Sequence, residues 1–441
     1  MTLVSQDISA RLRGVLPADL RGRVVRTSGL TAAVAGFPAP VGALVSIDRP
    51  SGEPLAGEVI GFLDDLTLVY LLDPATGLRH GDRVRLVSTN RSIRVGEALL
   101  GRVVNAQGQC IDGRPQPALA QRVPLDQPAP AATSRPRICE PLSTGVRAID
   151  GLLTCGQGQR LGLFAGAGVG KSVTLGMIAR YTSADVRVVA LVGERGREVN
   201  EFIERDLGPS LASSVVVVAT SDEPALARVQ AALAATSIAE YFRDRGKNVL
   251  LLVDSLTRMA LAQREIGLAA GEPPTTRGFP PSTFSVLPRL LERAGRTAAG
   301  SITGIYTVLV EGDDPQEPIA DSARSLLDGH VWLSRKLASA GHYPAIDVLD
   351  SLSRLMNAIV DDEHGSAAIA VRRTLATYRD HEDLISVGAY RAGSNPAVDH
   401  AIRFQAEVLE LLRQPIQQRS SIEQARADFM RLVARMAEEA A

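Results

Sequence analysis

Between residues 21 and 92, short runs of apolar and β-branched residues alternate with Gly, Pro and Asp. Even spacing of such runs is typical of the strands of a small β-barrel. The runs occupy residues 23–25, 32–35, 43–47, 56–62, 67–72 and 83–86. The pattern therefore predicts a barrel domain over residues 21–92. In residues 1–20, Ile8, Leu12, Val15 and Leu16 fall on one helical face, which predicts a short amphipathic tail before the barrel.

The pattern changes over residues 93–365, where near-continuous apolar runs alternate with longer helical segments. Strands that are buried on both faces have this character, and they belong to sheets that are mainly parallel. The runs are 186–192, 215–219, 249–253, 303–310 and 331–333. Between two of them, residues 224–245 predict a helix in which Leu226, Val229, Leu233 and Ile238 approximate one apolar stripe. This part of the chain is predicted to be an α/β domain.

Residues 366–441 are more polar and helical in pattern, and they predict a small C-terminal helical domain. Its last segment, 422–440, carries Phe429, Leu432, Val433 and Met436 at helical spacing. A stretch rich in Pro and Ala, residues 115–136, is expected to form a connector or an irregular layer. With 441 residues, the chain is long enough for two or three such domains.

Composition narrows the classes of function. The chain has 48 Lys and Arg against 49 Asp and Glu, a formal net charge of −1, so no global field attracts it to nucleic acid or to a membrane surface. Its three cysteines lack the paired spacing of a metal site and fit a reducing compartment. No window approaches the ~18 apolar residues of a membrane span. We therefore expect a cytoplasmic protein whose contacts with charged partners are local.

The run FAGAGVGKS, Phe164 to Ser172, lies between an apolar run and a helical pattern. In that context a Gly-rich loop turns its backbone N–H groups around phosphate oxygens. Lys171 can then reach the β- and γ-phosphates, and the Ser172 hydroxyl can ligate Mg²⁺. Ala165 stands where the pattern G-x-x-x-x-G-K-[ST] has its first glycine, but alanine is the smallest substitution and the loop is expected to survive. The sequence predicts a site for a nucleoside triphosphate.

Two carboxylates follow predicted buried strands. Asp254 comes directly after the run 249–253 and can hold the water shell of Mg²⁺, although it can also cap a helix that begins at Ser255. Glu194 comes just after the run 186–192 and can polarise the attacking water, although the charged run 194–198 can also be a solvated turn. The carboxyl ends of parallel strands share the edge of the sheet where ligands bind, which favours the catalytic interpretation.

Several longer runs go beyond these motifs. They are LGRVV (100–104), GVRAID (145–150), the phosphate loop, residues 193–198, DSLTR (254–258), AQREIGL (262–268), GEPP (271–274), RGFPPS (277–282), LLERAG (290–295), EGDD (311–314) and GHYPAID (341–347). Together they resemble the type III protein-export ATPases of flagella and injectisomes, relatives of the catalytic β subunit of rotary ATP synthases. The resemblance covers residues from about 30 to 393. It implies a P-loop, RecA-like fold, and in this family an alanine at the position of Ala165 is common.

The resemblance also implies roles for particular residues. The implied catalytic residues are Lys171, Glu194, Arg195, Asp254 and Arg354, with Arg354 as an arginine finger lent to the neighbouring subunit. The implied nucleotide-binding residues are Gly166, Ala167, Gly168, Val169, Gly170, Lys171, Ser172 and Val173, with Tyr343 stacked on adenine. Mg²⁺ is implied to contact Ser172 directly and Asp254 through water. Without the resemblance, Tyr343 reads as a turn residue before Pro344 and Arg354 as a surface arginine. The segment 411–416 resembles one that supplies further aromatics in rotary β subunits, but Leu411 and Ile416 occupy those positions.

The implied function is ATP hydrolysis by a homohexamer that energises protein export. Its implied partners are a stator-like regulator at the N-terminal tail, a central stalk-like protein, an export gate at the membrane, and export chaperones with their cargo, but no nucleic acid. The implied location is the cytoplasm, peripherally at the inner face of the cell membrane. Residues 29–36 and 58–62 favour a flagellar over an injectisome system.

Two other functions use the same core. One is the catalytic subunit of a rotary ATP synthase, but residues 380–390 resemble the export enzymes and the acidic DELSEED motif of synthase β subunits is not found. The other is a hexameric RNA translocase of the transcription-terminator type, which needs stacking aromatics in an N-terminal nucleic-acid-binding fold. Residues 1–90 contain only Phe37, Phe62 and Tyr70 as aromatics, which weakens that interpretation.

Overall fold

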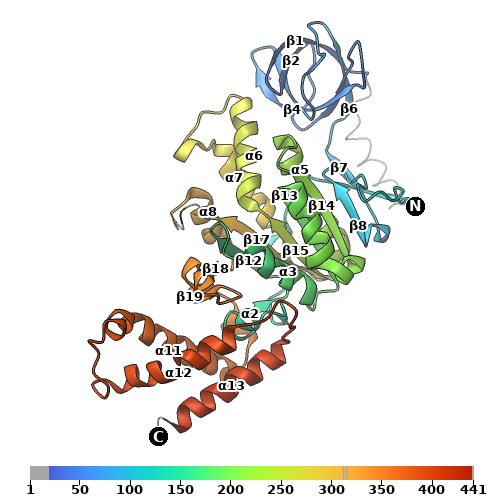
Figure 1. Ribbon diagram of the computed structural model, residues 1–441. Coiled ribbons are helices and arrows are strands. Elements are labelled where there is room, and N and C mark those ends of the chain that lie inside the picture. The colour runs from blue at the N-terminus through green and yellow to red at the C-terminus, as the bar shows by residue number, and fades with distance from the viewer. Residues whose placement is uncertain (1–18, 311, 313, 315, 440–441) are drawn as a thin grey trace.

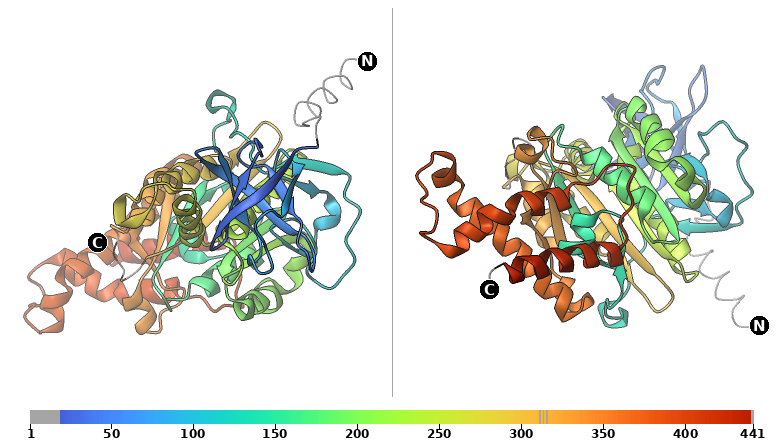
Figure 2. Two further views of the ribbon diagram at one scale, coloured as in Figure 1. Left: turned by 90° about the horizontal axis from the view of Figure 1, so that it is seen from above. Right: turned by 60° about the horizontal axis from the view of Figure 1, so that its bottom comes forward.

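A barrel, a sheet-centred middle part and a helical end follow one another along the long axis of the molecule (Figure 1). The computed structural model describes residues 19–310, 312, 314 and 316–439, so nearly all of the expected amphipathic tail lies outside the described residues. Figure 2 shows from two further directions that the C-terminal helices gather away from the barrel.

The N-terminal barrel confirms the predicted run of short strands. In its first strand Arg21 and Arg23 are exposed while Gly22 and Val24 are buried, because successive side chains point to opposite faces. Its six strands close in the order β1-β2-β5-β4-β3-β6. Their bounds are β1 Arg21–Ser28, β2 Thr31–Ala35, β3 Leu44–Ile47, β4 Leu55–Leu63, β5 Leu66–Leu71 and β6 Arg83–Ser88.

The middle part is built on a nine-stranded sheet with the order β19-β18-β12-β17-β15-β13-β14-β8, and β16 pairs with β17 beside this path. The sheet is parallel apart from β16 and the edge strand β19. The strands are β8 Arg102–Asn105, β12 Arg160–Ala165, β13 Val186–Glu194, β14 Ser214–Thr220, β15 Asn248–Asp254, β16 Gly295–Arg296, β17 Ser301–Leu309, β18 Gly329–Leu333 and β19 Ile346–Ser353. The predicted α/β class with a mainly parallel sheet is confirmed.

Helices cover both faces of this sheet, and alternate residues of each strand enter opposite cores. In β13, Val188 and Ala190 pack with α5 and α6, whereas Val189 and Leu191 pack with α3 on the other face. The helices are α2 Arg147–Leu152, α3 Lys171–Tyr181, α4 Gly196–Glu201, α5 Ala225–Arg243, α6 Leu256–Ala269, α7 Pro281–Leu291, α8 Pro318–Leu326, α9 Arg335–Ser339 and α10 Met356–Ile359. A π-helical turn, Phe202–Leu207, and a 3₁₀ turn, Gly208–Ser213, follow α4.

Helix α5 is buried all round rather than along one apolar stripe as expected. Every one of its residues except Arg228 is buried. One face packs on the sheet, and the other is covered by α6 and by a two-stranded antiparallel sheet of β7 Ser92–Val95 and β9 Gln121–Pro124. Its buried polar groups are paired: the Glu240 carboxylate accepts hydrogen bonds from Arg293 Nε and Nη2 at 2.9 and 2.7 Å. The Pro- and Ala-rich connector thus contains a strand that helps to bury α5.

The helical end begins earlier than expected. Helix α11 spans Asp362–Ser386, so a boundary between residues 365 and 366 falls inside it. The start is set by Asp361, whose side chain accepts a hydrogen bond from His364 N at 2.9 Å and caps the helix. Helices α12, Pro396–Leu412, and α13, Ile422–Glu438, complete this end. Phe429, Leu432 and Met436 of α13 are buried as predicted, and Phe429 packs against α2.

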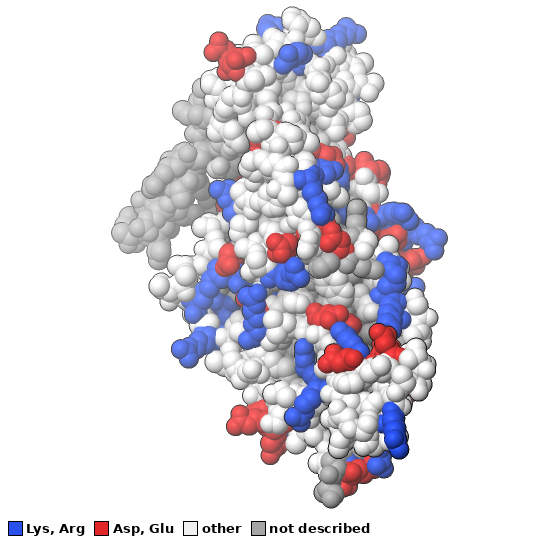
Figure 3. All heavy atoms as spheres, turned by 90° about the vertical axis from the view of Figure 1, so that its left-hand side faces the viewer, with Lys and Arg blue, Asp and Glu red and all other residues white. Residues whose placement is uncertain are grey.

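Lys and Arg are interspersed with Asp and Glu over the face drawn in Figure 3. Among the described helices, none combines the length and the apolar character that crossing a bilayer requires.

Candidate active site

The phosphate loop lies between β12 and α3, as the sequence predicts. Strand β12 ends at Ala165, and α3 begins at Lys171 after a loop whose last residue, Gly170, has a φ of 92°. That left-handed backbone favours glycine. The Gly170 carbonyl accepts hydrogen bonds from Thr174 N and Oγ1 at 3.0 and 3.1 Å, which fixes the first turn of α3. Ala165 is buried in regular β-pairing with its neighbours, so its methyl group leaves the loop undisturbed.

Lys171 lies between the two predicted carboxylates. Its Nζ is 3.0 Å from Glu194 Oε1 and also forms an ion pair with Asp254 Oδ1. Glu194 ends β13 and Asp254 ends β15, two adjacent strands whose carboxyl ends meet beside the loop. The carboxyl ends of parallel strands therefore bring together three residues that are far apart in the sequence.

Burial shapes the charges of these groups. Burial of Lys171 favours the neutral amine, but the charges of Asp254 and Glu194 outweigh it and raise the pKa of Lys171. Burial also raises the pKa of Glu194, and a hydrogen bond with Glu198 adds to this, while Lys171 and Arg258 oppose it. A carboxylate with a raised pKa is a better proton acceptor near neutral pH than an ordinary glutamate.

Asp254 does not cap α6. The helix begins at Leu256, and its cap is Ser255, whose Oγ accepts a hydrogen bond from Arg258 N at 3.2 Å. The Asp254 carboxylate instead contacts Lys171 and accepts a hydrogen bond from Thr307 Oγ1 at 2.6 Å. The alternative interpretation of Asp254 as a helix cap is therefore wrong.

The structure adds two neighbours of the carboxylates, Arg258 and Thr307, to the residues that the sequence predicts. Arg258 donates a hydrogen bond to the Gly193 carbonyl and lies 3.4 Å from Glu194 Oε2. It belongs to the run DSLTR, one helical turn after Asp254, which is a signal that could have found it. Thr307 lies within an apolar strand, and only the pairing of β17 with β15 brings its hydroxyl to Asp254.

The donor set fits a hard cation held together with a phosphate. Ser172 presents an exposed hydroxyl on the first turn of α3, and Asp254 offers a buried carboxylate at the same edge of the sheet. Hydroxyl and carboxylate oxygens are the ligands that Mg²⁺ prefers, and it keeps several waters of its own.

Tyr343 lies beside the phosphate loop. A Cβ atom built on Gly170 would come within 3.3 Å of Tyr343 Cε1, and 42% of the Tyr343 residue surface is exposed. Its carbonyl accepts a hydrogen bond from Gln414 N at 3.0 Å, which holds the segment 411–416 next to it. A partly exposed aromatic side chain therefore lies next to the phosphate loop.

The side chains of two further predicted residues are exposed. Arg195 is largely exposed, and its Nη1 is 3.6 Å from Glu198 Oε1. Arg354 is exposed at the end of the sheet opposite the phosphate loop. Its backbone N–H donates to the Asp328 carbonyl at 3.0 Å. Asp328 is bonded to Arg160, the first residue of β12, whereas the loop follows the last residue of β12. Because a six-residue strand is roughly 17 Å long, Arg354 lies roughly that far from the loop.

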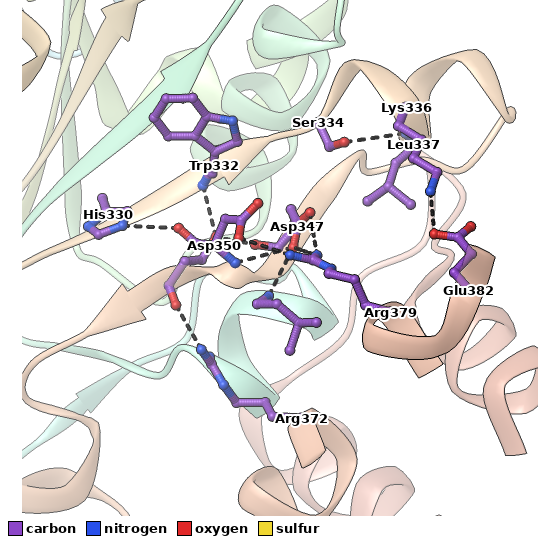
Figure 4. A network of polar contacts seen from close by, with 12 residues as sticks. His330, Trp332, Ser334, Lys336, Leu337, Asp347, Asp350, Arg372, Arg379 and Glu382 are labelled. Atoms are coloured by element: carbon purple, nitrogen blue, oxygen red, sulfur yellow. Dashed lines mark hydrogen bonds and ion pairs between the residues drawn. The ribbon is translucent and has the colours of Figure 1, made fainter. Parts of the chain in front are cut away.

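A network of polar contacts joins the edge strand to the helical end (Figure 4). Arg379 of α11 binds both carboxylate oxygens of Asp347 on β19, at 2.5 and 2.7 Å, and Asp350 Oδ1 at 2.9 Å. Lys336 of α9 pairs with Glu382 of α11 at 2.5 Å. The segment with Tyr343 follows α9 and precedes β19, so this network frames it on both sides.

The fold and the loop define the class: a P-loop protein with an acid pair at the carboxyl edge of a RecA-like sheet. Residues 145–353 match the family model of the nucleotide-binding domain of the ATP synthase alpha/beta family, and residues 360–431 match that of the T3SS EscN ATPase C-terminal domain. The chain is 49% identical to the flagellum-specific ATP synthase of Bacillus subtilis, over 92% of this chain and 93% of that one. It is 51% identical to a type 3 secretion system ATPase of Xanthomonas euvesicatoria, over 91% of each chain.

A solved structure agrees with these relatives. That of the assembled ATPase EscN from the type III secretion system of enteropathogenic E. coli superimposes with a TM-score of 0.90 at 45% identity, covering 93% of this chain and all of that one. The chain belongs to the family of ATPases of flagellar and type III secretion systems, within the ATP synthase alpha/beta family. It is an ATP-hydrolysing enzyme.

Proposed function

We propose that this chain works as a Mg²⁺-dependent homohexamer whose ATP hydrolysis energises type III protein export, in a flagellar system. The observation that carries the proposal is the convergence of Lys171, Glu194 and Asp254 beside the phosphate loop. One cation and two acids at that place serve phosphoryl transfer to water, in which nearly all catalysis is positioning and charge stabilisation.

Each residue then has a distinct part. The loop 166–170 and the start of α3 hold the phosphates of ATP, and Lys171 exchanges its acid partners for phosphate oxygens. Ser172, and Asp254 through a water molecule, would hold Mg²⁺, which would supply positive charge beside the β- and γ-phosphates. Glu194 orients the attacking water and takes its proton, and its raised pKa suits that task. Tyr343 stacks on adenine.

Arg354 cannot serve the site of its own chain, because it lies at the opposite end of β12 from the loop. We propose that it reaches the γ-phosphate of the neighbouring subunit, as an arginine finger supplied in trans does. Arg195 is exposed on the loop side at the start of α4 and is proposed to face the same junction between subunits. Catalysis then depends on assembly.

The proposed partners of this chain are based on the solved structures of its relative EscN. EscN has been solved as an assembled ATPase and in complex with its central stalk EscO, with a TM-score of 0.86 for the latter. By that likeness we propose a ring for this chain and a stalk-like protein in its centre. A stator-like regulator at the N-terminal tail, an export gate at the membrane, and chaperones with cargo complete the proposed assembly. The proposed location is the cytoplasmic face of the cell membrane.

The test is made in the organism that encodes the chain. The gene is replaced by the Lys171→Ala variant, and flagellar filament subunits and injectisome cargo are each measured in the culture medium. We expect normal levels of the variant protein and loss of filament subunits only. Loss of injectisome cargo alone would assign the chain to an injectisome, and export of both at wild-type levels would contradict a role in export.

A further inference from the structure

Thr307 is a polar residue near the carboxyl end of an apolar strand. Its side chain is fully buried in β17, among Tyr306, Val308 and the strands on either side. A buried hydroxyl is costly unless it is hydrogen-bonded. Thr307 Oγ1 donates to Asp254 Oδ1 at 2.6 Å and lies 3.3 Å from the Val253 carbonyl.

The backbone around Thr307 is held firmly. Leu309 N donates to Thr257 Oγ1 at 2.9 Å, which ties the end of β17 to the first turn of α6. The paired residues Val253 and Tyr306 fix β17 against β15 just before this point. Because a β-branched side chain is also stiff at χ1, the direction of the Thr307 hydroxyl is set before any ligand binds.

Both contacts of Asp254 fall on the same oxygen. Lys171 Nζ and Thr307 Oγ1 each bind Oδ1, so the carboxylate is rotated with Oδ2 away from the two donors. When Lys171 turns to the phosphates of a nucleotide, Thr307 still holds Oδ1. A hydrogen bond to a charged group is among the stronger ones in proteins, which suits it to fix one rotamer.

We propose that Thr307 is a positioning residue that orients Asp254 toward the water shell of the Mg²⁺ bound with ATP. The inference rests on the proposed role of Asp254. Thr307 touches neither nucleotide nor metal in this proposal. It acts only by holding the aspartate, and its effect appears only when Mg²⁺ is present.

The experiment compares nucleotide affinity with and without the metal. Isothermal titration calorimetry measures ATP binding to the purified full chain in EDTA and in excess Mg²⁺, and the ratio of the two dissociation constants is the metal-dependent gain. For Thr307→Val we expect affinity in EDTA within about twofold of wild type and a gain reduced by roughly 10-fold, the order expected for one charge-assisted hydrogen bond. Thr307→Ser keeps the hydroxyl and is expected to restore the gain.

The matched control is Thr236→Val. Thr236 is also fully buried, but among the residues that the structure describes its hydroxyl bonds only to the Ala232 carbonyl within α5, at 2.8 Å. Thr236→Val shows the effect of losing a buried hydroxyl by itself, and we expect its Mg²⁺-dependent gain in ATP affinity to equal that of the wild type. If Thr307→Val does not fold, the pair Thr307→Ala and Thr307→Ser makes the same comparison.

Three outcomes would overturn the inference: an unchanged gain in Thr307→Val, an equal loss of affinity with and without Mg²⁺, or failure of Thr307→Ser to restore the gain. Asp254→Asn separates the two proposals. If Asp254→Asn keeps the full Mg²⁺-dependent gain in ATP affinity, the proposed role of Asp254 itself is refuted. If Asp254→Asn loses that gain while Thr307→Val keeps it, only the role of Thr307 is refuted.

Discussion

Lys171 is the charge on which the two acids of the site depend. Glu194 and Asp254 are both buried, and an isolated buried carboxylate would be strongly destabilised as an anion. The Lys171 ammonium compensates both, and Arg258 adds a second cation beside Glu194. Because the pKa of Glu194 remains above its ordinary value, this compensation is incomplete, and Glu194 accepts a proton more readily than an ordinary glutamate does.

The first prediction concerns Glu194→Gln. The amide keeps the shape of the side chain but cannot take a proton, so kcat is expected to fall by about 10²-fold or more with ATP affinity unchanged. The wild-type rate is expected to rise with pH through the raised pKa of Glu194, and the variant is expected to lose that acid limb. Steady-state kinetics between pH 5 and 9 and calorimetry measure these effects.

The control for this prediction is Glu201→Gln. Glu201 lies on the adjoining helix α4 and pairs with Arg197 at 2.8 Å. Its substitution is expected to leave the pH profile unchanged. An equal loss of affinity and rate in Glu194→Gln would indicate a structural role for Glu194 instead.

At the scale of residues, the sequence predicts those site residues that lie next to a recognisable motif or at the end of an apolar run. Lys171 and Ser172 follow the loop directly, and Glu194 and Asp254 each end an apolar run. Thr307 could not be predicted in the same way, because its contact with Asp254 depends on which strands are neighbours and in which register. The role of Arg354 is implied by the family resemblance alone, since the contacts that it makes with described residues, to the Asp328 and Arg324 carbonyls, lie far from the loop.

At the scale of elements, strand order explains why the site forms. β17 lies between β12 and β15, and β13 follows β15, so the carboxyl ends of four neighbouring strands carry the loop, Thr307, Asp254 and Glu194. Apolar runs predicted these strands because both their faces are buried. The pattern does not predict the start of α11, because the capping residue Asp361 lies outside the apolar positions. It does not predict the full burial of α5, because the second face of α5 is covered by the two-stranded sheet of β7 and β9, which is distant in the sequence.

The second prediction concerns the junction of α11 with β19. Arg379 is the main cation there, and its pKa is raised because Asp347 and Asp350 outweigh its partial burial. Arg379→Met removes these ion pairs, so amide hydrogen exchange in α11 and in residues 340–350 is expected to quicken, while exchange in the barrel stays the same.

Arg373→Met is the control for Arg379, because Arg373 lies on the same helix but lines the groove between α11, α12 and α13. Hydrogen exchange read by mass spectrometry compares the two variants. Equal changes in both, or a change confined to the C-terminal half of α11, would contradict a specific role of Arg379 in fixing the helical end.

At the scale of the whole molecule, Glu58 joins the barrel to the middle part. It lines a cavity of about 720 Å³ between β4, the connector and the helices α6 and α7. Its carboxylate accepts hydrogen bonds from Gln230 Nε2 at 2.8 Å and Arg91 Nη1 at 3.1 Å, and Arg91 is shared with Asp126. Burial raises the pKa of Glu58 to about 7 although Arg91 and Gln230 oppose the shift.

The third prediction follows from this pKa. The pKa of Glu58 is about 4.5 in the unfolded chain and about 7 in the folded protein, so between these values the folded protein binds the proton more tightly. Its contribution to stability is therefore full below pH 4.5 and is lost as the pH rises through 7. Between pH 5 and 8, Glu58→Gln is expected to remove roughly 2 to 3 kcal/mol of the pH dependence of unfolding. Urea unfolding at both pH values measures it, and an unaltered dependence would contradict the prediction.

The fourth prediction concerns Arg354 in the assembled ring. Arg354→Ala is expected to keep nucleotide affinity and to lose roughly 10³-fold in kcat, the range known for arginine fingers. Mixing it with Lys171→Ala is expected to restore part of the activity, because an Arg354→Ala subunit keeps its own loop and can receive the arginine of a Lys171→Ala neighbour. Phosphate release from mixed samples measures this.

Co-assembly of the two variants is checked by capture of one tagged chain with the other. A mixture that assembles but stays inactive at every ratio would contradict the finger in trans. So would full activity in a strictly monomeric wild-type sample.

Arg354 and the phosphate loop lie at opposite ends of β12. On the proposed mechanism, each subunit therefore offers its arginine at one end and accepts a neighbour's arginine at the other. Contacts of this head-to-tail kind close only in a ring. On the proposed mechanism, a lone chain completes no site, an open row of n chains completes n − 1, and only the closed circle completes all n. Closing the circle thus adds one working site without adding a chain, so a partner that merely seals the last gap would act as an activator without touching a nucleotide.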